Sequence, residues 1–207
     1  MNSYRKIIIA TIALLLSTAG RVEGQHDCEL KKQNKDLKVY SCTSGDNALK
    51  VVKVELTLEN TSIKELLDFV TDIPNYVNWQ YNTKEATILT KTDRSIIYRA
   101  VVETPWPLAN RELIVEITTE LDSVGRVLII DSHHVAYAYP QAKHLIRVPY
   151  VVGIWHVSSV KNSLKVEFIL RIDPGGSVPV WLVNVAMAEG PYHSFMKLKE
   201  ELKQKRP

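Results

Sequence analysis

The segment from Leu49 to Glu59 alternates, from Val52 onward, between apolar and polar residues. Charged and hydroxyl side chains occupy every second position. The apolar positions between them are Val52, Val54, Leu56 and Leu58. A period of two is typical of a β-strand with one buried face. We therefore predict a half-buried strand over this segment.

The spacing of apolar residues then becomes helical. Ser62 and Glu65 have the spacing of a capping box, in which each side chain bonds to the other residue's backbone N–H. The apolar residues that follow are Ile63, Leu66, Leu67 and Val70. A short amphipathic helix is predicted, ending at Asp72–Pro74, with a brief second helical turn over residues 75–81.

Strand patterns then follow one another almost without interruption. The predicted strands cover residues 84–92, 95–104, 111–121, 126–135, 148–160 and 164–173, after an early strand at 37–42. Turns as short as KTDR, DSVG and KNS separate them, and sequential strands joined by short turns form an antiparallel meander. One longer loop, at 136–143, interrupts the series.

The last segment, residues 180–203, returns to helical spacing. Its apolar stripe consists of Trp181, Val185, Ala188, Tyr192, Phe195 and Leu202. We expect a kink at Gly190–Pro191, because Pro191 removes a bond to the carbonyl of Met187. A sheet with one apolar face must cover that face, and this helix is the long element available. The predicted class is α+β: a curved antiparallel sheet wrapped around a long C-terminal helix, with an internal hydrophobic cavity.

The N-terminus has the three-part pattern of a secretory signal. The basic stretch MNSYRK precedes an apolar run from Ile7 to Leu16, and the small residues of STAGRVEGQ follow. That run is too short to span a bilayer comfortably. We predict a signal peptide over residues 1–24, with a second choice of cleavage site near Gly20. The mature domain then covers residues 25–207 and is exported, to the periplasm or out of the cell.

Composition adds limits to this picture. The 207 residues are 45% hydrophobic and 24% charged, which fits one packed domain, and a net charge of +3 gives no basis for nucleic acid binding. The chain has two cysteines, Cys28 and Cys42. An exported chain favours a disulfide between them over two free thiols. Their spacing is not that of a zinc site, and no metal or other cofactor is predicted.

Five motifs in the chain resemble those of the START domain, a lipid-transfer domain of the Bet v 1-like (SRPBCC) superfamily. They are CELKKQNKDLKVYS, LKVVKVELTLENTSIKELLDFV, PWPLANREL, HLIRVPYVVGIWHV and, most specific, DPGGSVPVWLVNVAMAEGPYHSFMKLKEEL. The resemblance covers about residues 27–204 and implies a helix-grip fold with a cavity for a lipid. In the family, the first motif begins as a helix. Glu112 replaces the usual Asp, and Tyr98 and Ile117 stand where cholesterol-binding members carry an acid and a base, which speaks against a sterol.

The cavity is expected to be lined by inward-facing residues of the strands and of the last helix. These candidate ligand-binding residues are Tyr98, Val102, Val115, Ile117, Trp155, Phe168, Leu170, Trp181 and Val185. The alternative for each of them is ordinary core. His156, next to Trp155, is the candidate polar group of the cavity. His133 and His134 are adjacent on a strand and point to opposite faces, so they cannot hold one metal ion together.

The corner TPWPLANREL, residues 104–113, is predicted to be structural. Trp106, Pro107 and Leu108 are interpreted as an apolar plug that closes one end of the sheet. Arg111 shares the parity of the inward-facing residues on the next strand. We expect it to anchor the corner through carboxylate or carbonyl bonds, with direct ligand contact as the alternative.

The predicted function is that of a monomeric, non-enzymatic protein that holds one lipid and touches a membrane transiently. The sequence contains no recognisable catalytic motif. One alternative is a cyclase or aromatase that acts on a polyketide-like substrate, and another is an interaction protein whose helix reports ligand occupancy. The last helix and the loop at 136–143 are expected to open together as a gate, since lids come from the least stable parts of a fold.

Overall fold

The computed structural model describes residues 27–43, 49–137 and 139–204. Within these ranges the chain forms one ten-stranded sheet whose order is β1-β2-β3-β10-β9-β7-β6-β5-β4, with β8 paired to β6. The strands are β1 (Cys28–Gln33), β2 (Leu37–Cys42), β3 (Lys50–Glu59), β4 (Thr83–Lys91), β5 (Ser95–Val102), β6 (Arg111–Leu121), β7 (Val127–His134), β8 (Ile146–Arg147), β9 (Tyr150–Val160) and β10 (Ser163–Asp173). The helices are α2 (Ile63–Val70), the 3-10 turn η1 (Ile73–Asn75), α3 (Tyr76–Trp79) and α4 (Val180–Gln204).

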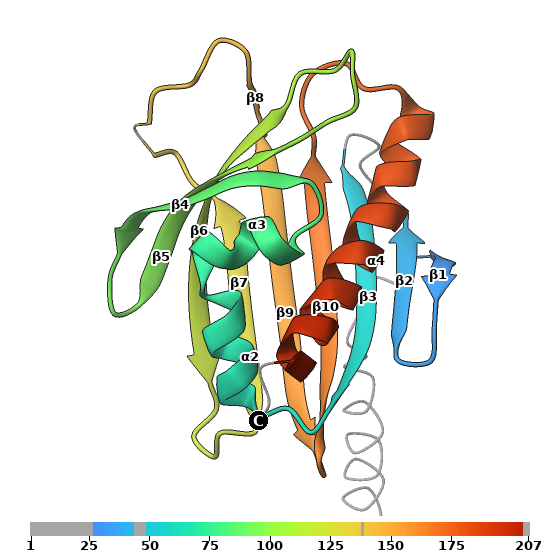
Figure 1. Ribbon diagram of the computed structural model, residues 1–207, viewed down its shortest axis with the longest axis vertical. Coiled ribbons are helices and arrows are strands. Elements are labelled where there is room, and N and C mark those ends of the chain that lie inside the picture. Colours follow the sequence, from blue (N-terminus) through green and yellow to red (C-terminus); the bar gives the residue numbers. More distant parts are fainter. Residues whose placement is uncertain (1–26, 44–48, 138, 205–207) are drawn as a thin grey trace, which may run out of the picture.

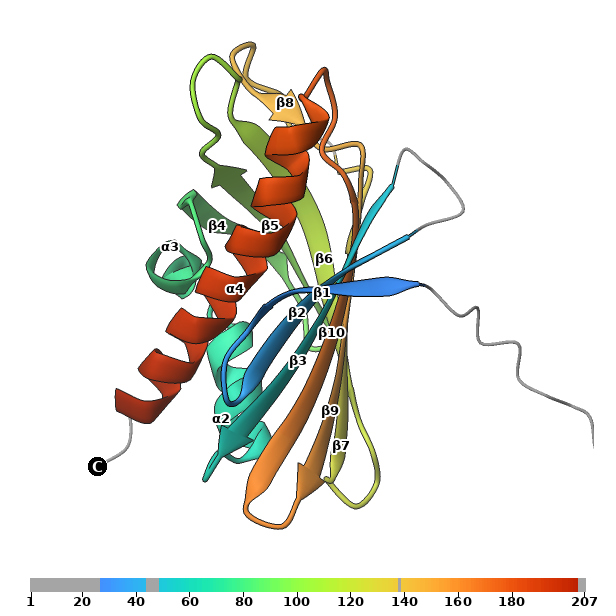
Figure 2. The same cartoon turned by 90° about the vertical axis from the view of Figure 1, so that its right-hand side faces the viewer.

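The sheet curves around the helices. Figures 1 and 2 show α2, α3 and α4 on the same, concave side of the sheet, with α4 running along most of its length. All strand pairs along the main path are antiparallel, and the short β8 pairs with β6 in parallel. The predicted class, a helix-grip α+β fold, is confirmed. No helix in the described part of the chain is both long and apolar enough to cross a membrane.

Most predicted elements lie within two residues of the observed ones, and the capping box is confirmed. The Ser62 hydroxyl accepts from the Glu65 backbone N–H at 3.2 Å, and the Glu65 carboxylate accepts from the Ser62 N–H at 2.7 Å. These two bonds satisfy N–H groups that the first turn of α2 leaves free. The helix therefore begins where its sequence directs it to begin.

Strand β1 is the element that the sequence pattern did not reveal. The family resemblance implied a helix at this place, but residues 28–33 pair with β2 as an edge strand. Almost all of β1 is exposed and polar, so no alternation marks it. The turn after it has a local cause: the Asn34 side chain accepts from the backbone N–H groups of Asp36 and Leu37 at 2.9 Å each.

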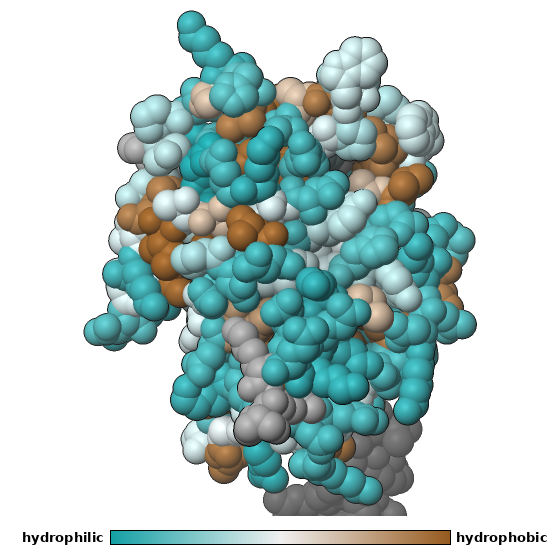
Figure 3. Space-filling view, in the orientation of Figure 1, coloured by the Kyte–Doolittle hydropathy of each residue, from teal (hydrophilic) through white to brown (hydrophobic). Residues whose placement is uncertain are grey.

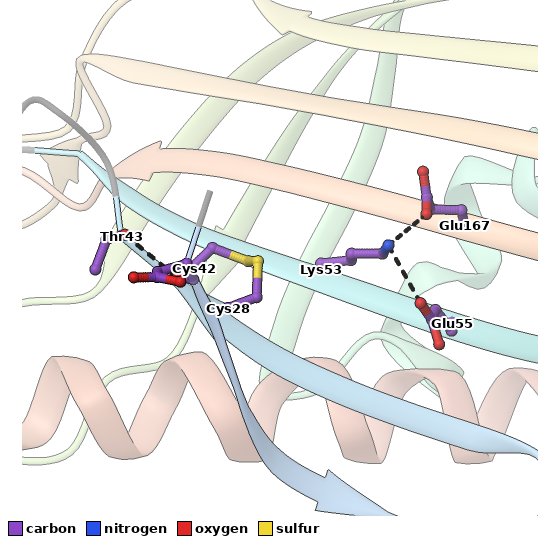
Figure 4. Close-up of a disulfide and its surroundings, with 7 residues drawn as sticks. Cys28, Cys42, Thr43, Lys53, Glu55 and Glu167 are labelled. Carbon is purple, nitrogen blue, oxygen red and sulfur yellow. Dashed lines mark hydrogen bonds and ion pairs between the residues drawn. A yellow bond between two sulfur atoms is a disulfide. The ribbon is translucent and has the colours of Figure 1, made fainter. Parts of the chain in front are cut away.

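The predicted disulfide between Cys28 and Cys42 is present. The two residues are direct partners in the register of β1 and β2, at the end of the hairpin away from its turn (Figure 4). The two cysteines are 14 positions apart in the sequence. The disulfide therefore holds the edge strand β1 on the sheet at the end where the turn cannot.

Helix α4 departs from its predicted stripe. Phe195, Leu198 and Leu202 are buried against the sheet side, whereas Trp181 is 67% and Val185 is 50% exposed. The helix continues across Pro191 without a break. Its C-terminal half thus belongs to the core, and its N-terminal half presents apolar side chains to the outside.

Candidate functional site

An inner chamber of about 240 Å³ lies between the concave face of the sheet, α3 and the middle of α4. Strand alternation explains its lining, because every second residue of β5, β6, β7, β9 and β10 faces inward. Seven of the predicted candidates lie in its wall: Tyr98, Val102, Val115, Ile117, Trp155, Phe168 and Leu170. Three rings from β9, β10 and α4 meet there, since the centroids of Trp155, Phe168 and Phe195 are 5.0 to 5.3 Å apart.

An outer chamber of about 320 Å³ lies between the corner that joins β5 to β6 and the first half of α4. Its wall includes Val102 to Pro105 on the corner side and Leu182, Val183 and Val185 on the helix side. The two chambers share seven wall residues: Tyr81, Val102, Leu113, Leu170, Ile172, Gly190 and Pro191. They are therefore adjoining chambers that share one wall, the inner one against the sheet interior and the outer one beside the first half of α4.

The last two candidate ligand residues, both on α4, lie elsewhere than expected. Val185 borders the outer chamber with half of its side chain exposed. Trp181 borders neither chamber and points outward. In the first half of α4 it is Val183 and Met187 that face the core, so Trp181 and Val185 lie on the other side of the helix.

Two other interpretations of aromatic and imidazole groups are wrong. Trp106 is 92% exposed, so it does not plug the end of the sheet. His156 is exposed and lies on the outer face, because the inward position on β9 belongs to its neighbour Trp155. Trp106 lies in a corner, where no strand alternation determines which way a side chain points. His156 lies on a strand but was assigned to the wrong face of it.

Arg111 is 6% exposed and bonds only to backbone carbonyls. Its guanidinium donates to the carbonyl of Ala109 at 2.6 Å, of Gly175 at 3.1 Å and of Pro174 at 3.3 Å. Burial lowers the pKa of this group. The side chain ties the corner to the loop that leads into α4, and three of its five N–H donors bond to the protein itself.

Glu112 forms a buried ion cluster that sequence reasoning missed. Its carboxylate is fully buried and accepts from Arg99 Nε at 2.6 Å and from Arg147 at 2.5 and 3.0 Å. Desolvation raises the pKa of Glu112, but the hydrogen bonds from the two arginines outweigh it and leave the pKa below its usual value. The cluster holds β8 against β6. Its partners are 13 and 35 residues away in sequence, and no local pattern joins them.

The same cluster holds the loop that was expected to act as a gate. Arg147 donates to the carbonyl of Tyr139 at 3.0 Å, and Arg99 lies 5.6 Å from the centre of the Tyr139 ring. Figure 1 shows this loop at the side of the sheet away from the start of α4. The corner of residues 103–110, rather than this loop, faces the first half of α4 across the outer chamber.

The polar groups of the inner chamber are few. Tyr76 donates to the carbonyl of Val70 at 2.7 Å, and Ser132 donates to that of Gly153 at 2.8 Å. Tyr98 has no hydrogen-bond partner in the described part of the chain, and Nε1 of Trp79 is buried without one. Burial raises the pKa of the Tyr98 hydroxyl. No group of three or more His, Cys, Asp or Glu residues that could hold a metal occurs within the described ranges.

Comparison with known proteins adds a family to this geometry. The START domain family model matches residues 27–205. An uncharacterized protein of Pseudomonas aeruginosa is 24% identical over 90% of this chain and 92% of its own. The phosphatidylcholine transfer protein of Mus musculus is 25% identical over 79% of this chain and 78% of its own.

Solved structures show the same fold. A STAR-related lipid transfer protein from Xanthomonas axonopodis superposes with a TM-score of 0.77 at 24% identity, covering 86% of this chain and 99% of that one. A Streptomyces aromatase/cyclase, Zhui, superposes less closely, with a TM-score of 0.53 at 10% identity over 76% and 95%. At these identities the likeness concerns the fold and leaves the chemistry open.

Proposed function

The chain belongs to the START domain family, and we propose that it binds one lipid molecule in its two adjoining chambers and transfers it between membranes. The observation that carries this proposal is the pair of largely apolar chambers between the sheet and α4. Pockets of this kind bind hydrophobic ligands through mostly apolar walls and a few polar groups. We assign ligand contact to the seven wall residues of the inner chamber, to Val185 in the outer one, and none to Trp181.

The entrance that the geometry supports best is the outer chamber. Opening it requires the corner of residues 103–110 to separate from the first half of α4. Both sides carry exposed apolar side chains, namely Trp106 on the corner and Trp181 and Val185 on the helix. Figure 3 shows hydrophobic surface gathered over the start of α4. Exposed aromatics around an entrance are suited to the interface of a bilayer, so we propose that this end touches the membrane during loading.

The cellular setting is part of the same proposal. The predicted signal peptide, residues 1–24, lies outside the described residues. The disulfide supports an oxidising compartment, since such bonds persist in exported proteins. We propose an exported, monomeric domain over residues 25–207, in the periplasm or outside the cell.

A cyclase or aromatase remains the alternative on this fold. Such an enzyme needs an acid or base within reach of its substrate. The residues that line the inner chamber, as far as the structure describes them, include no carboxylate, imidazole, lysine or arginine. This lining favours binding over catalysis.

The test is native mass spectrometry of the mature protein, followed by transfer of a fluorescently labelled lipid between vesicles. We expect one bound lipid per chain and a transfer rate that rises with protein concentration. Absence of both bound lipid and transfer would reject the proposal. Conversion of a polyketide-like substrate in place of lipid transfer would favour the enzyme.

A further inference from the structure

The inner and outer chambers differ in the charge of the residues that line them. The wall of the inner chamber has no charged side chain among the described residues. The outer chamber has three charged residues in its wall: Glu103, Arg111 and Glu189. Burying a charge without a partner is costly, so the end of the ligand that reaches the inner chamber is uncharged.

The outer chamber is also a poor site for an anionic headgroup. Arg111 uses three of its five N–H donors on carbonyls of the protein. Glu189 is already paired with Lys32 at 2.6 Å and lies 3.2 Å from His193. A phosphate placed here would meet two carboxylates and an arginine that already makes three bonds to the protein. The walls therefore carry more negative than positive charge and disfavour an anionic head.

One hydroxyl in the wall of the inner chamber can donate a hydrogen bond to a ligand. Tyr98 and Tyr76 lie together there, with ring centroids 5.4 Å apart, but only the Tyr76 hydroxyl has a protein acceptor. The Tyr98 hydroxyl has none within the described ranges, and burial keeps it protonated as a donor. A second donor, Nε1 of Trp79, is buried without a partner in a ring that contacts Tyr76. Buried donors normally have acceptors, and the chamber is where a ligand would supply one.

The size of the space limits the ligand further. Chambers of about 240 and 320 Å³ fall in or near the range of roughly 300–1,000 Å³ that holds one drug-sized molecule. A lipid with a single chain is of that size, whereas a phospholipid with two acyl chains is larger.

We propose that the ligand is an uncharged, single-chain lipid whose carbonyl or ether oxygen accepts a hydrogen bond from the Tyr98 hydroxyl in the inner chamber. This inference rests on the proposed lipid-binding function and narrows its ligand. It separates this chain from the phosphatidylcholine transfer proteins that it resembles in sequence. Tyr98 is then a residue that determines specificity, in addition to lining the cavity.

The experiment compares probes that differ in one chemical feature. Methyl laurate is an uncharged single-chain ester, and tridecane has similar length without the oxygens. Laurate and lauroyl lysophosphatidylcholine add a charged or zwitterionic head to the same chain, and dioleoyl phosphatidylcholine adds a second chain. Binding is measured by quenching of tryptophan fluorescence, with native mass spectrometry to count bound molecules.

The variants are Tyr98→Phe, which removes one oxygen, and Tyr40→Phe as a control. Tyr40 lies on β2, and its hydroxyl donates to Glu55 on the outer face of the sheet. We expect the wild type and Tyr40→Phe to bind methyl laurate about three- to tenfold more tightly than tridecane, the range of one hydrogen bond. Tyr98→Phe loses this preference and keeps its affinity for tridecane. The charged and two-chain probes bind more weakly than the ester.

Two outcomes overturn the inference and leave the proposed function standing. One is an unchanged ester preference in Tyr98→Phe. The other is laurate, lysophosphatidylcholine or phosphatidylcholine bound as tightly as methyl laurate. Failure of every probe, including dioleoyl phosphatidylcholine, to bind the wild type rejects the proposed function itself, so the two failures are distinguishable.

Discussion

The two halves of α4 have different surroundings although one helix contains both. Beyond Pro191 its side chains enter the core, and Lys199 pairs with Asp36 of the β1–β2 hairpin. Before Gly190 it borders the outer chamber and exposes Trp181 and Val185, and Glu189 ties it to Lys32 of β1. The comparison shows that the second half supplies most of the buried side chains of the helix, while the first half forms a wall of the outer chamber.

The largest effect is expected from the second half. Leu198 is fully buried, and Leu198→Ala should lower the free energy of unfolding by ~2–5 kcal/mol, because it leaves a cavity. Val185→Ala is the matched change in the exposed half and should cost under about 0.5 kcal/mol. Urea unfolding measures both. Equal losses of stability would show that the two halves of α4 are packed alike, which would contradict the difference described above.

Arg111 is the anchor at the beginning of the exposed half. Arg111→Ala removes three bonds to carbonyls of the corner and of the loop before α4. We expect a loss of roughly 2–4 kcal/mol, since buried groups are left unpaired. Arg111→Lys should recover little of this, because lysine lacks the planar fork of donors. A melting temperature unchanged in both variants would contradict the anchor.

The disulfide supports the hairpin on which the second half of α4 rests. Replacing Cys28 and Cys42 together by serine should cost about 3 kcal/mol on the chain-entropy model. The hairpin supplies Lys32, Asn34 and Asp36 to α4, so lipid transfer should also change. Reduction of the wild type is the matched control and should reproduce the loss. Full stability after reduction would mean that the strand pairing alone holds β1 in place.

Strand parity predicted much of the inner chamber. Once a strand is known, alternation decides which side chains face inward, and Val115, Ile117, Trp155, Phe168 and Leu170 all follow that rule. The surrounding strands alternate cleanly because one face is buried and the other is wet. The residues that line the concave face of the sheet can therefore be predicted from the sequence, even when the curvature of the sheet is not known.

The remaining errors have a common physical cause. A helical period shows that apolar residues share a face, but it does not say what covers that face, and so Trp181 was misplaced. Trp106 stands in a corner with no period at all. Glu112 is on the opposite side of β6 from Arg111, and its arginine partners come from β5 and from β8, which pairs beside this end of β6. Each of these placements depends on segments that are distant in sequence.

The exposed half is expected to matter for transfer more than for stability. Trp106→Ala and Trp181→Ala should each change the free energy of unfolding by under about 0.5 kcal/mol. Together they should slow lipid transfer between vesicles by about tenfold, because a bilayer contact of ~1.4 kcal/mol is lost. Val124 is an exposed residue in the turn between β6 and β7, at the other end of the sheet, and Val124→Ala is the control. Equal rates in all variants would place the membrane contact elsewhere.

The smallest effect concerns the ion pairs between α4 and the β1–β2 hairpin. A hydrogen bond from Lys199 lowers the pKa of Asp36, and one from Lys32 lowers the pKa of Glu189. Carboxylates with a lowered folded-state pKa stabilise the fold above their usual pKa, and the contribution is lost as the pH falls through the lowered value. Because the usual carboxylate range lies near pH 4, the loss should be confined to about pH 4 and below.

Asp36→Asn combined with Glu189→Gln tests these pairs. Both are partly exposed, so the double variant should lose only about 1 kcal/mol at pH 7. The difference from the wild type should shrink as the pH falls below about 4 and the wild-type carboxylates become protonated. Urea unfolding at several pH values measures the gap. Lys64 and Asp68 form an exposed pair on α2, and Asp68→Asn is the control, with little change expected at any pH. A gap that persists at low pH would mean that the two side chains support α4 by packing rather than by charge.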